Sequence, residues 1–235
     1  MSSDLSFTGG TTTASLTLKI SPRAKVMRLR VDPRTGSVLL TLPKRASRKK
    51  ALEWVAGQRA WIEAALADIA PPVPLGPGAT IPFRGEPHLV DWEQGRARTV
   101  KVEDGRLLVG GPLEGLEARL VRWLKREAKS LLESETREFA AKANVTVTRT
   151  GVGDTLSRWG SCSSSGAIRY SWRLILAPDW VRRATVAHEV AHRVHMNHGP
   201  QFHALVECLY GTDPAPARHW LRREGPALHR FGRQL

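Results

Sequence analysis

The segment His188-Glu189-Val190-Ala191-His192 constrains this chain more than any other stretch of its sequence. Residues four apart share one face of an α-helix, so on a helix the two imidazoles can reach a single metal ion. Glu189 is rotated by about 100° from His188, which lets its carboxylate hold a water beside that metal without ligating it. The motif predicts a helix that carries two ligands and the base of a zinc hydrolase.

The residues around the motif favour a helix. Pro178 and Asp179 form a start signal with Asp179 as the expected N-cap, and residues 180–196 have a helical composition. The sequence NHGP at 197–200 then predicts a stop and a turn. The alternative is a surface helix with two solvent-exposed histidines, and this context weakens it.

His198 follows His192 by six residues and is the candidate for a third ligand. In a continued helix it would face about 240° away from His192. A sharp turn at residues 197–199 would instead fold it back beneath the helix. The alternative is a C-cap histidine that interacts with the helix dipole. We interpret His195 as a residue beside the site or on the surface, and His203 as a weaker ligand candidate.

Several segments together resemble the YgjP-like (DUF45, SprT-related) zinc metallopeptidase-like family. They are RWGSC at 158–162, WRLILAP at 172–178, the motif at 188–192 and HMNHGPQF at 195–202. The resemblance is close over residues 157–206 and extends to LRVD at 29–32 and WI at 61–62. It implies a zincin-type site with one Zn²⁺ per chain, ligands His188, His192 and His198, and Glu189 as the catalytic base. It leaves the substrate open, since the family is associated both with peptidases and with nucleoside triphosphate pyrophosphohydrolysis.

The expected chemistry follows from these parts. Three neutral imidazoles leave Zn²⁺ one open position for water, whose pKa falls to about 7 in such sites. Glu189 would take a proton from that water and deliver it to the leaving group. Candidate oxyanion or substrate contacts are Arg158, Tyr170 and Arg173, in the segment that precedes the motif. For each of them the alternative is a surface arginine or an ordinary strand tyrosine.

The stretch 167–176 alternates and is rich in Ile, Tyr, Trp and Leu, which predicts a strand after a serine-rich turn. A strand leading into the metal helix suits a peptidase, because an extended peptide can add to a sheet edge. Trp54, Trp61, Trp159 and Trp172 are expected in the core, the alternative for Trp159 and Trp172 being platforms for the substrate. Only Cys162 and Cys208 are present and there is no CxxC pair, so Cys162 is expected to be a buried free thiol.

The formal net charge is +14, and much of the excess lies between residues 19 and 50. Such a field attracts nucleic acid, nucleotides or other polyanions. The candidate anion-binding face consists of Arg28, Arg30, Lys49 and Lys50. The alternative is a coding bias towards arginine that carries no ligand. A polypeptide substrate is the preferred partner, with a nucleotide or nucleic acid second.

The sequence predicts a cytoplasmic protein without membrane association. Residues 1–16 have neither a basic segment nor an apolar run, which argues against a signal peptide. No stretch approaches the roughly 20 apolar residues that span a bilayer. Two lone cysteines are typical of a reducing compartment.

The predicted fold class is α+β: a β-rich amino-terminal portion with a helix, then a zincin-like helical metal domain with a small sheet. Residues 1–13 are expected to be disordered, and no internal repeat is visible. We divide the chain into a basic hairpin-plus-helix region (1–70), a linker with short strands (71–110) and a metallohydrolase domain (111–235). Strands are expected at 14–20, 26–32, 37–42, 80–83, 88–92, 99–103, 106–109 and 145–148, a turn at 33–36, and helices at 47–69, 114–143, 201–210 and 215–223.

Three functions remain open on the sequence alone. The leading one is a zinc-dependent hydrolase that cleaves peptide bonds. The second is cleavage of nucleoside triphosphates at the same site, which the absence of a glycine-rich phosphate loop and of an acidic Mg²⁺ cluster weakens. The third is a non-catalytic, basic nucleic-acid-binding module with structural zinc. Structural sites use four protein ligands, so this third function would need His195 or His203 as the fourth.

Overall fold

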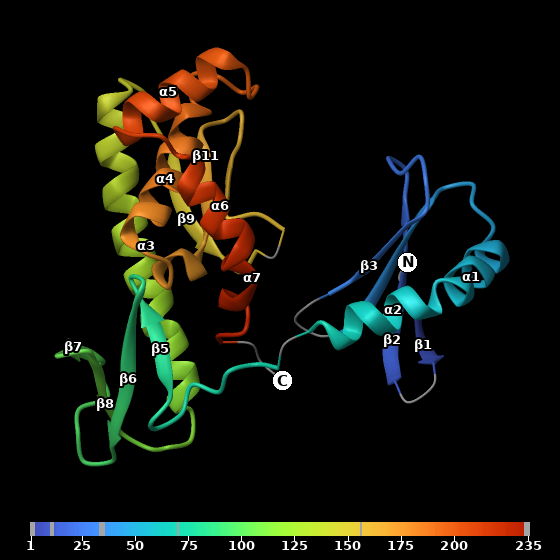
Figure 1. Cartoon of the computed structure of the whole chain (residues 1–235), viewed down its shortest axis with the longest axis horizontal. Helices are drawn as coiled ribbons and strands as arrows, with labels where there is room; N and C mark the ends of the chain where they lie inside the picture. The colour runs from blue at the N-terminus through green and yellow to red at the C-terminus, as the bar shows by residue number, and fades with distance from the viewer. Residues whose placement is uncertain (1–2, 10–11, 33–35, 70, 156, 233–235) are drawn as a thin grey trace. The chain divides into compact units, whose positions relative to one another are not determined.

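The structure is a computed structural model that describes residues 3–9, 12–32, 36–69, 71–155 and 157–232 (Figure 1). It divides into two compact units, Met1–Pro72 and Val73–Gly232. The residues that the structure describes form helices and three small mixed sheets, so the predicted α+β class is confirmed. In the described part of the chain, no helix combines the length and the apolar character needed to cross a bilayer.

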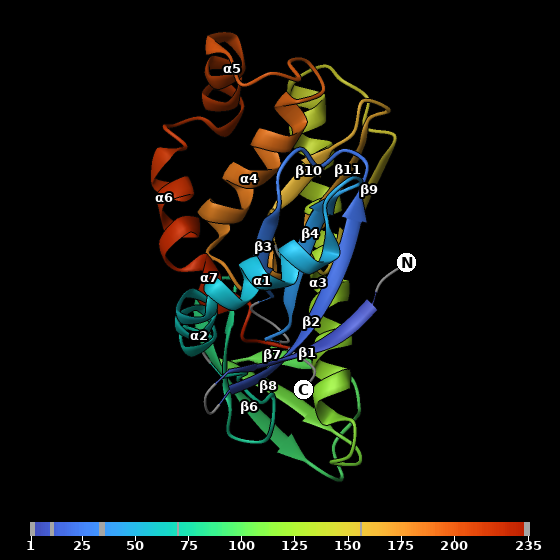
Figure 2. The same cartoon turned by 90° about the vertical axis from the view of Figure 1, so that its right-hand side faces the viewer.

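The first unit is a sheet with two helices on one face. Its strands are β1 (Ser3–Gly9), β2 (Thr12–Ser21), β3 (Arg28–Val31) and β4 (Val38–Pro43), in the order β1-β2-β4-β3. Helices α1 (Arg48–Gly57) and α2 (Arg59–Ala67) follow, and Figure 2 shows α1 crossing β3 and β4. Leucines of the sheet and apolar side chains of both helices form one buried cluster. As the alternation in β3 predicts, Leu29 packs against this cluster while Arg28 and Arg30 are exposed.

Three expectations for this unit need correction. Residues 3–9 are not disordered, because β1 pairs antiparallel with β2 along its whole length. The single helix expected at 47–69 is broken at Gln58, which ends α1 and begins α2. This break turns Trp61 outwards to 48% exposure, so its assignment to the core was wrong. The turn expected at 33–36 lies largely outside the described residues.

The second unit begins with a sheet of the same topology. Its strands are β5 (Thr80–Phe83), β6 (Glu86–Glu93), β7 (Lys101–Glu103) and β8 (Arg106–Gly110), in the order β5-β6-β8-β7. As in the first sheet, the central pair is parallel and the outer pairs are antiparallel. The two units therefore share a four-strand arrangement, although no internal repeat is visible in the sequence. This second sheet contributes apolar side chains to the same core as the long helix α3 (Leu116–Lys142).

A three-stranded sheet and four α-helices complete the second unit. The sheet has the order β10-β11-β9, from β9 (Arg149–Gly153), β10 (Gly160–Cys162) and β11 (Ala167–Ser171). A 3₁₀ turn η1 (Trp172–Ile175) leads into α4 (Asp179–Ala191). Helices α5 (Pro200–Tyr210), α6 (Ala215–Arg223) and α7 (Gly225–Leu228) follow, and Figure 1 shows α4 lying between α3 and α6.

Several boundaries differ from the predicted ones. The strand expected at 145–148 starts later, as β9, and the strand expected at 167–176 ends at Ser171. There the Ser171 hydroxyl accepts a hydrogen bond from the Arg173 amide, which caps the 3₁₀ turn. The metal helix ends at Ala191 rather than near residue 196, and its N-cap is Pro178 rather than Asp179. Strand β10 and helix α7 were not predicted.

The start of α4 is held by groups from distant parts of the unit. In the turn between β5 and β6, the Arg84 amide donates to the Ile175 carbonyl (2.7 Å) and the Gly85 amide to the Leu176 carbonyl (3.2 Å). Gly85 has a positive φ of 88°, and a Cβ there would lie 2.7 Å from the Pro178 Cα. Only glycine permits this approach, which fixes the point where the metal helix begins.

Candidate metal centre

Helix α4 presents its polar end to a turn that returns beneath it. His188 and Glu189 lie in its last turn, and His192 is its C-cap. The chain then turns through residues 193–199, and Pro200 starts α5 at the position where a helix tolerates proline best. This turn brings His198 back to the other two histidines. The three form one group whose ligating nitrogens all lie within 4.8 Å of one another.

The donor set fits a zinc ion. The Nε2 atoms of His188 and His198 lie 3.2 Å apart. In a tetrahedral zinc site with Zn–N distances near 2.0–2.1 Å, two ligand nitrogens are about 3.3 Å apart. Within the described residues the group has only these three members, and neither His195 nor His203 belongs to it. Three imidazoles with space beside them are the donor set of a catalytic site rather than of a closed structural one.

Two further contacts orient the imidazoles. The Nδ1 of His192 lies 3.1 Å from the carbonyl oxygen of His195. Because a carbonyl only accepts, Nδ1 carries the proton and Nε2 keeps the lone pair that a metal needs. The ring of Phe202, on α5, packs against all three imidazoles with centroid distances of 4.9, 4.6 and 4.7 Å. Phe202 is buried and was not singled out from the sequence.

The electrostatics keep the histidines neutral. Burial lowers the pKa of His188 to about 4, assisted by its neighbours His192 and His198 and by the charge of Arg218. Burial also lowers the pKa of His192. A neutral imidazole is the form that binds a metal. At pH 7 His188 is therefore already neutral and does not have to lose a proton before it binds a metal ion.

Glu189 lies beside this cluster in a tight enclosure. It is 5% exposed, and burial raises its pKa to about 7 against the opposing charge of Arg158. Its side chain lies directly against Gly160, the first residue of β10. A Cβ at position 160 would be 2.5 Å from both the Cγ and the Oε1 of Glu189. A carboxylate with a pKa near neutrality, held at a metal centre, can accept and return a proton.

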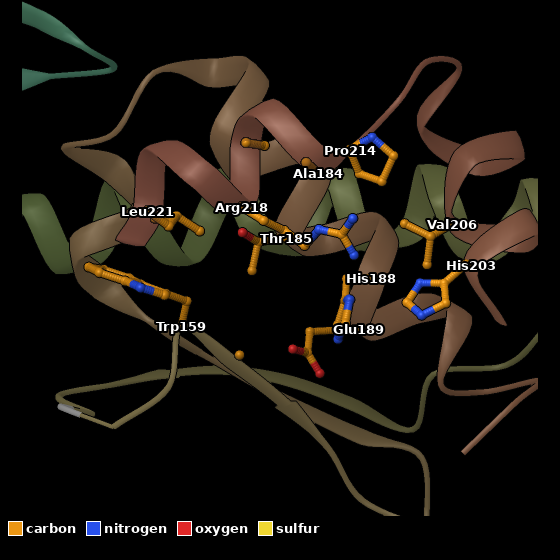
Figure 3. A pocket seen from close by; sticks show the side chains of 12 residues that line it. Trp159, Ala184, Thr185, His188, Glu189, His203, Val206, Pro214, Arg218 and Leu221 are labelled. Atoms are coloured by element: carbon orange, nitrogen blue, oxygen red, sulfur yellow. The ribbon is translucent and has the colours of Figure 1, made fainter. Parts of the chain in front are cut away.

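A pocket opens beside His188 and Glu189 (Figure 3). Its volume is about 190 Å³, and its polar side chains include Arg218 from α6 and His203 from α5. Most of its remaining wall is apolar and comes from Trp159, Ala184, Val206, Pro214, Ala217 and Leu221. Arg218 could not be singled out as a site residue from the sequence, because nothing in the sequence places α6 against α4.

The three predicted substrate contacts have different positions. Arg158 is exposed and close enough to Glu189 to affect its pKa, so it stays a candidate. Tyr170 is fully buried and its hydroxyl is 3.0 Å from the Thr136 hydroxyl. Arg173 is also fully buried and donates to Asp154 and to the Phe231 carbonyl. Neither of these two side chains reaches solvent, so their assignment as substrate contacts was wrong.

The expected core tryptophans and free thiols are only partly as predicted. Trp172 is fully buried, whereas Trp159 packs against the core and also lines the pocket. Cys162 and Cys208 are both free thiols. Cys162 is only half-buried, however, and Cys208 is exposed.

The four predicted anion-binding residues lie in the first unit. Arg28 and Arg30 point away from the helices on β3, and Lys49 and Lys50 lie exposed in the first turn of α1. Since α1 packs on the opposite face of the sheet, the four do not share one surface of β3. Their role in binding anions stays a prediction.

We expect His198→Ala to weaken zinc binding by more than about 100-fold, because even partners of zinc ligands contribute 10- to 100-fold. Competition with a chromogenic chelator would measure the affinity. His195→Ala is the matched control, since the His195 carbonyl that contacts His192 stays in place and the His195 side chain is not a member of the three-histidine group. A His198→Ala protein that retains a full equivalent of tightly bound zinc would exclude His198 as a ligand.

The chain matches the model of a known protein family. The model of the family described as YgjP-like, metallopeptidase domain, matches residues 25–224, which is most of the chain and includes the three histidines and Glu189. No curated protein and no solved structure matched.

Proposed function

Since the chain belongs to the YgjP-like metallopeptidase family, we propose that it is a zinc-dependent hydrolase that cleaves peptide bonds. The observation that carries this proposal is the convergence of His188, His192 and His198 beside the buried carboxylate of Glu189. The three imidazoles would hold the metal. When bound, a zinc ion supplies Lewis acidity and makes water more acidic.

The residues of the chain would transfer the proton and hold the reacting groups in position. Glu189 accepts a proton from the attacking water and passes it to the leaving amine. Gly160 leaves the space in which the Glu189 carboxylate lies. Phe202 and the His195 carbonyl hold the imidazoles in position, so that little reorganisation is needed on binding.

An extended polypeptide fits the surroundings of this carboxylate. Strand β10 is at the edge of its sheet, and its first residue touches Glu189. A peptide that added to this edge would pass beside Glu189. The adjoining pocket of about 190 Å³ is smaller than the roughly 300–1,000 Å³ of sites for drug-sized ligands, which favours one amino-acid residue over a nucleotide.

Hydrolysis of a nucleoside triphosphate is the second candidate. A separate hollow of about 540 Å³ on the β9–β11 sheet is lined by Arg149, Arg158 and Arg169 and contains no carboxylate. Such a set of guanidiniums suits phosphate groups. Arg158, which lines this hollow, is also close enough to Glu189 for its positive charge to lower the pKa of that carboxyl.

One experiment separates the two candidates. The protein, stripped of metal by a chelator or reloaded with zinc, is incubated with a mixture of unstructured polypeptide and nucleoside triphosphates, and mass spectrometry identifies the products. We expect new peptide termini only in the zinc-loaded sample. Zinc-dependent nucleotide products with intact polypeptide would overturn the peptidase proposal in favour of phosphoanhydride hydrolysis.

A further inference from the structure

We propose that the pocket beside the metal centre binds the carboxy-terminal residue of a peptide, with Arg218 binding its free carboxylate and the apolar wall binding its side chain. This inference rests on the proposed peptidase function and narrows it to removal of an apolar amino acid from the end of a chain. The pocket is lined by residues of α4, α5, α6 and β10, together with Trp159 before β10 and Pro214 before α6, all in the second unit.

The walls of the pocket select an apolar side chain. Trp159 and Leu221 lie at one end (Figure 3). Ala184 of α4 and Ala217 of α6 also line the pocket, and their small side chains occupy little of its space. Val206 and Pro214 line the side nearer His203. Burial of apolar surface contributes roughly 25 cal/mol per Å², so an aliphatic or aromatic side chain would gain most here.

Arg218 adds a charge to this apolar pocket. In Figure 3 its guanidinium points into the pocket above His188. The arginines of α4 behave differently, since Arg182 and Arg183 both donate to carboxylates of α3. In the part of the chain that the structure describes, Arg218 has no such carboxylate partner. A guanidinium that lines an apolar pocket without such a partner is suited to a carboxylate on the ligand.

A carboxy-terminal residue supplies both groups within the space available. Its side chain and its carboxylate leave the same Cα, so one residue can meet the apolar wall and Arg218 together. A residue inside a chain would bring a neutral amide to Arg218 and would need room for the chain beyond it. The volume of about 190 Å³ suits the first case better.

The reaction would be a simple hydrolysis. The water oxygen bonds to the last peptide carbonyl carbon, and the bond from that carbon to the amide nitrogen breaks. One proton of the water passes through Glu189 to the departing amine. The second proton leaves the new carboxyl group for the amine or for solvent, so the products are the shortened peptide, with a new carboxylate, and one free apolar amino acid.

The test uses zinc-loaded full-length protein and pairs of peptides that end in leucine, either as the free acid or as the amide. We expect the free acid to be cleaved at least about tenfold faster in kcat/KM. Arg218→Gln should lower kcat/KM for the acid by about 10- to 100-fold, mainly through KM, and change the amide by less than about threefold. Arg222→Gln, the same change four residues along α6, is the matched control because Arg222 does not line the pocket.

Side-chain selectivity gives a second measurement. Leu221→Ala should widen the pocket and shift the preferred terminal residue from leucine towards phenylalanine or tryptophan. Among terminal residues in the parent protein, aspartate should be the poorest.

The possible outcomes separate this inference from the proposed function. Cleavage inside peptides without regard to their end would overturn the inference and leave the peptidase intact. Equal losses for acid and amide in Arg218→Gln would also overturn it, and would make Arg218 a group that stabilises the oxyanion. Absence of any zinc-dependent peptide cleavage would instead refute the peptidase. Calorimetric titration of the zinc-loaded protein with N-acetyl-leucine would then decide the inference: binding that weakens in Arg218→Gln supports the carboxylate site, and no binding overturns it.

Discussion

Glu189→Gln is expected to lower kcat for peptide hydrolysis by about 10²- to 10⁴-fold, the usual contribution of a general base. The amide keeps the shape of the carboxylate but cannot accept the proton. Metal binding should be unchanged, because Glu189 is not a member of the three-histidine group. Single-turnover assays give the rate, and elemental analysis of the dialysed protein gives the metal content.

Gly160→Ala tests the position of the same carboxylate without changing Glu189 itself. A Cβ at position 160 would be 2.5 Å from Glu189 Oε1, so the carboxylate must move to make room. A displacement of about 1 Å in a catalytic group can cost about 100-fold in rate. We therefore expect a loss of that order with metal content retained. A Glu189→Gln protein that keeps its full rate after removal of any wild-type contaminant would rule out Glu189 as the base.

Arg182→Met is expected to destabilise the second unit by about 3–5 kcal/mol, since a buried carboxylate loses all its hydrogen bonds from Arg182 and keeps only a longer ion pair of 3.7 Å with Arg183. Arg182 is 1% exposed, and its guanidinium donates to both oxygens of Glu135 on α3 at 2.8–3.2 Å. It also donates to Asp179 at 2.7 Å. This pair ties the metal helix to the long helix. Urea unfolding of the metal-free protein, followed by circular dichroism, would measure the change in the free energy of unfolding.

The double variant Arg182→Met/Glu135→Leu separates two explanations for that loss. If the loss is caused by the buried charge of Glu135 without its Arg182 hydrogen bonds, replacing both partners should restore much of the free energy of unfolding. If the double variant is as unstable as Arg182→Met alone, lost packing is the cause and the explanation by charge fails. Lys129→Met is the matched control on α3, because its ion pair with Glu133 is largely exposed and should contribute little.

The local features of the site could be predicted from the sequence because they depend on residues close together in the chain. The spacing of His188 and His192 is set by helix geometry, and the stop signal NHGP at 197–200 predicted that the chain turns after the helix and returns His198 to them. The alternation in β3 likewise predicted which side of that strand is buried. The end of α4 was placed too late, because residues 193–196 have a composition that a helix also tolerates.

What the sequence by itself determined is therefore the chemistry of one helix and the turn after it: three imidazoles, one carboxylate and the direction in which each points. The tertiary structure decided which other residues share that space. It buried Arg173 and Tyr170, placed Gly160 against Glu189, and brought Arg218 of α6 to the pocket beside α4. Periodicity records which face of an element is buried, but contacts between distant elements depend on the packing of the whole core.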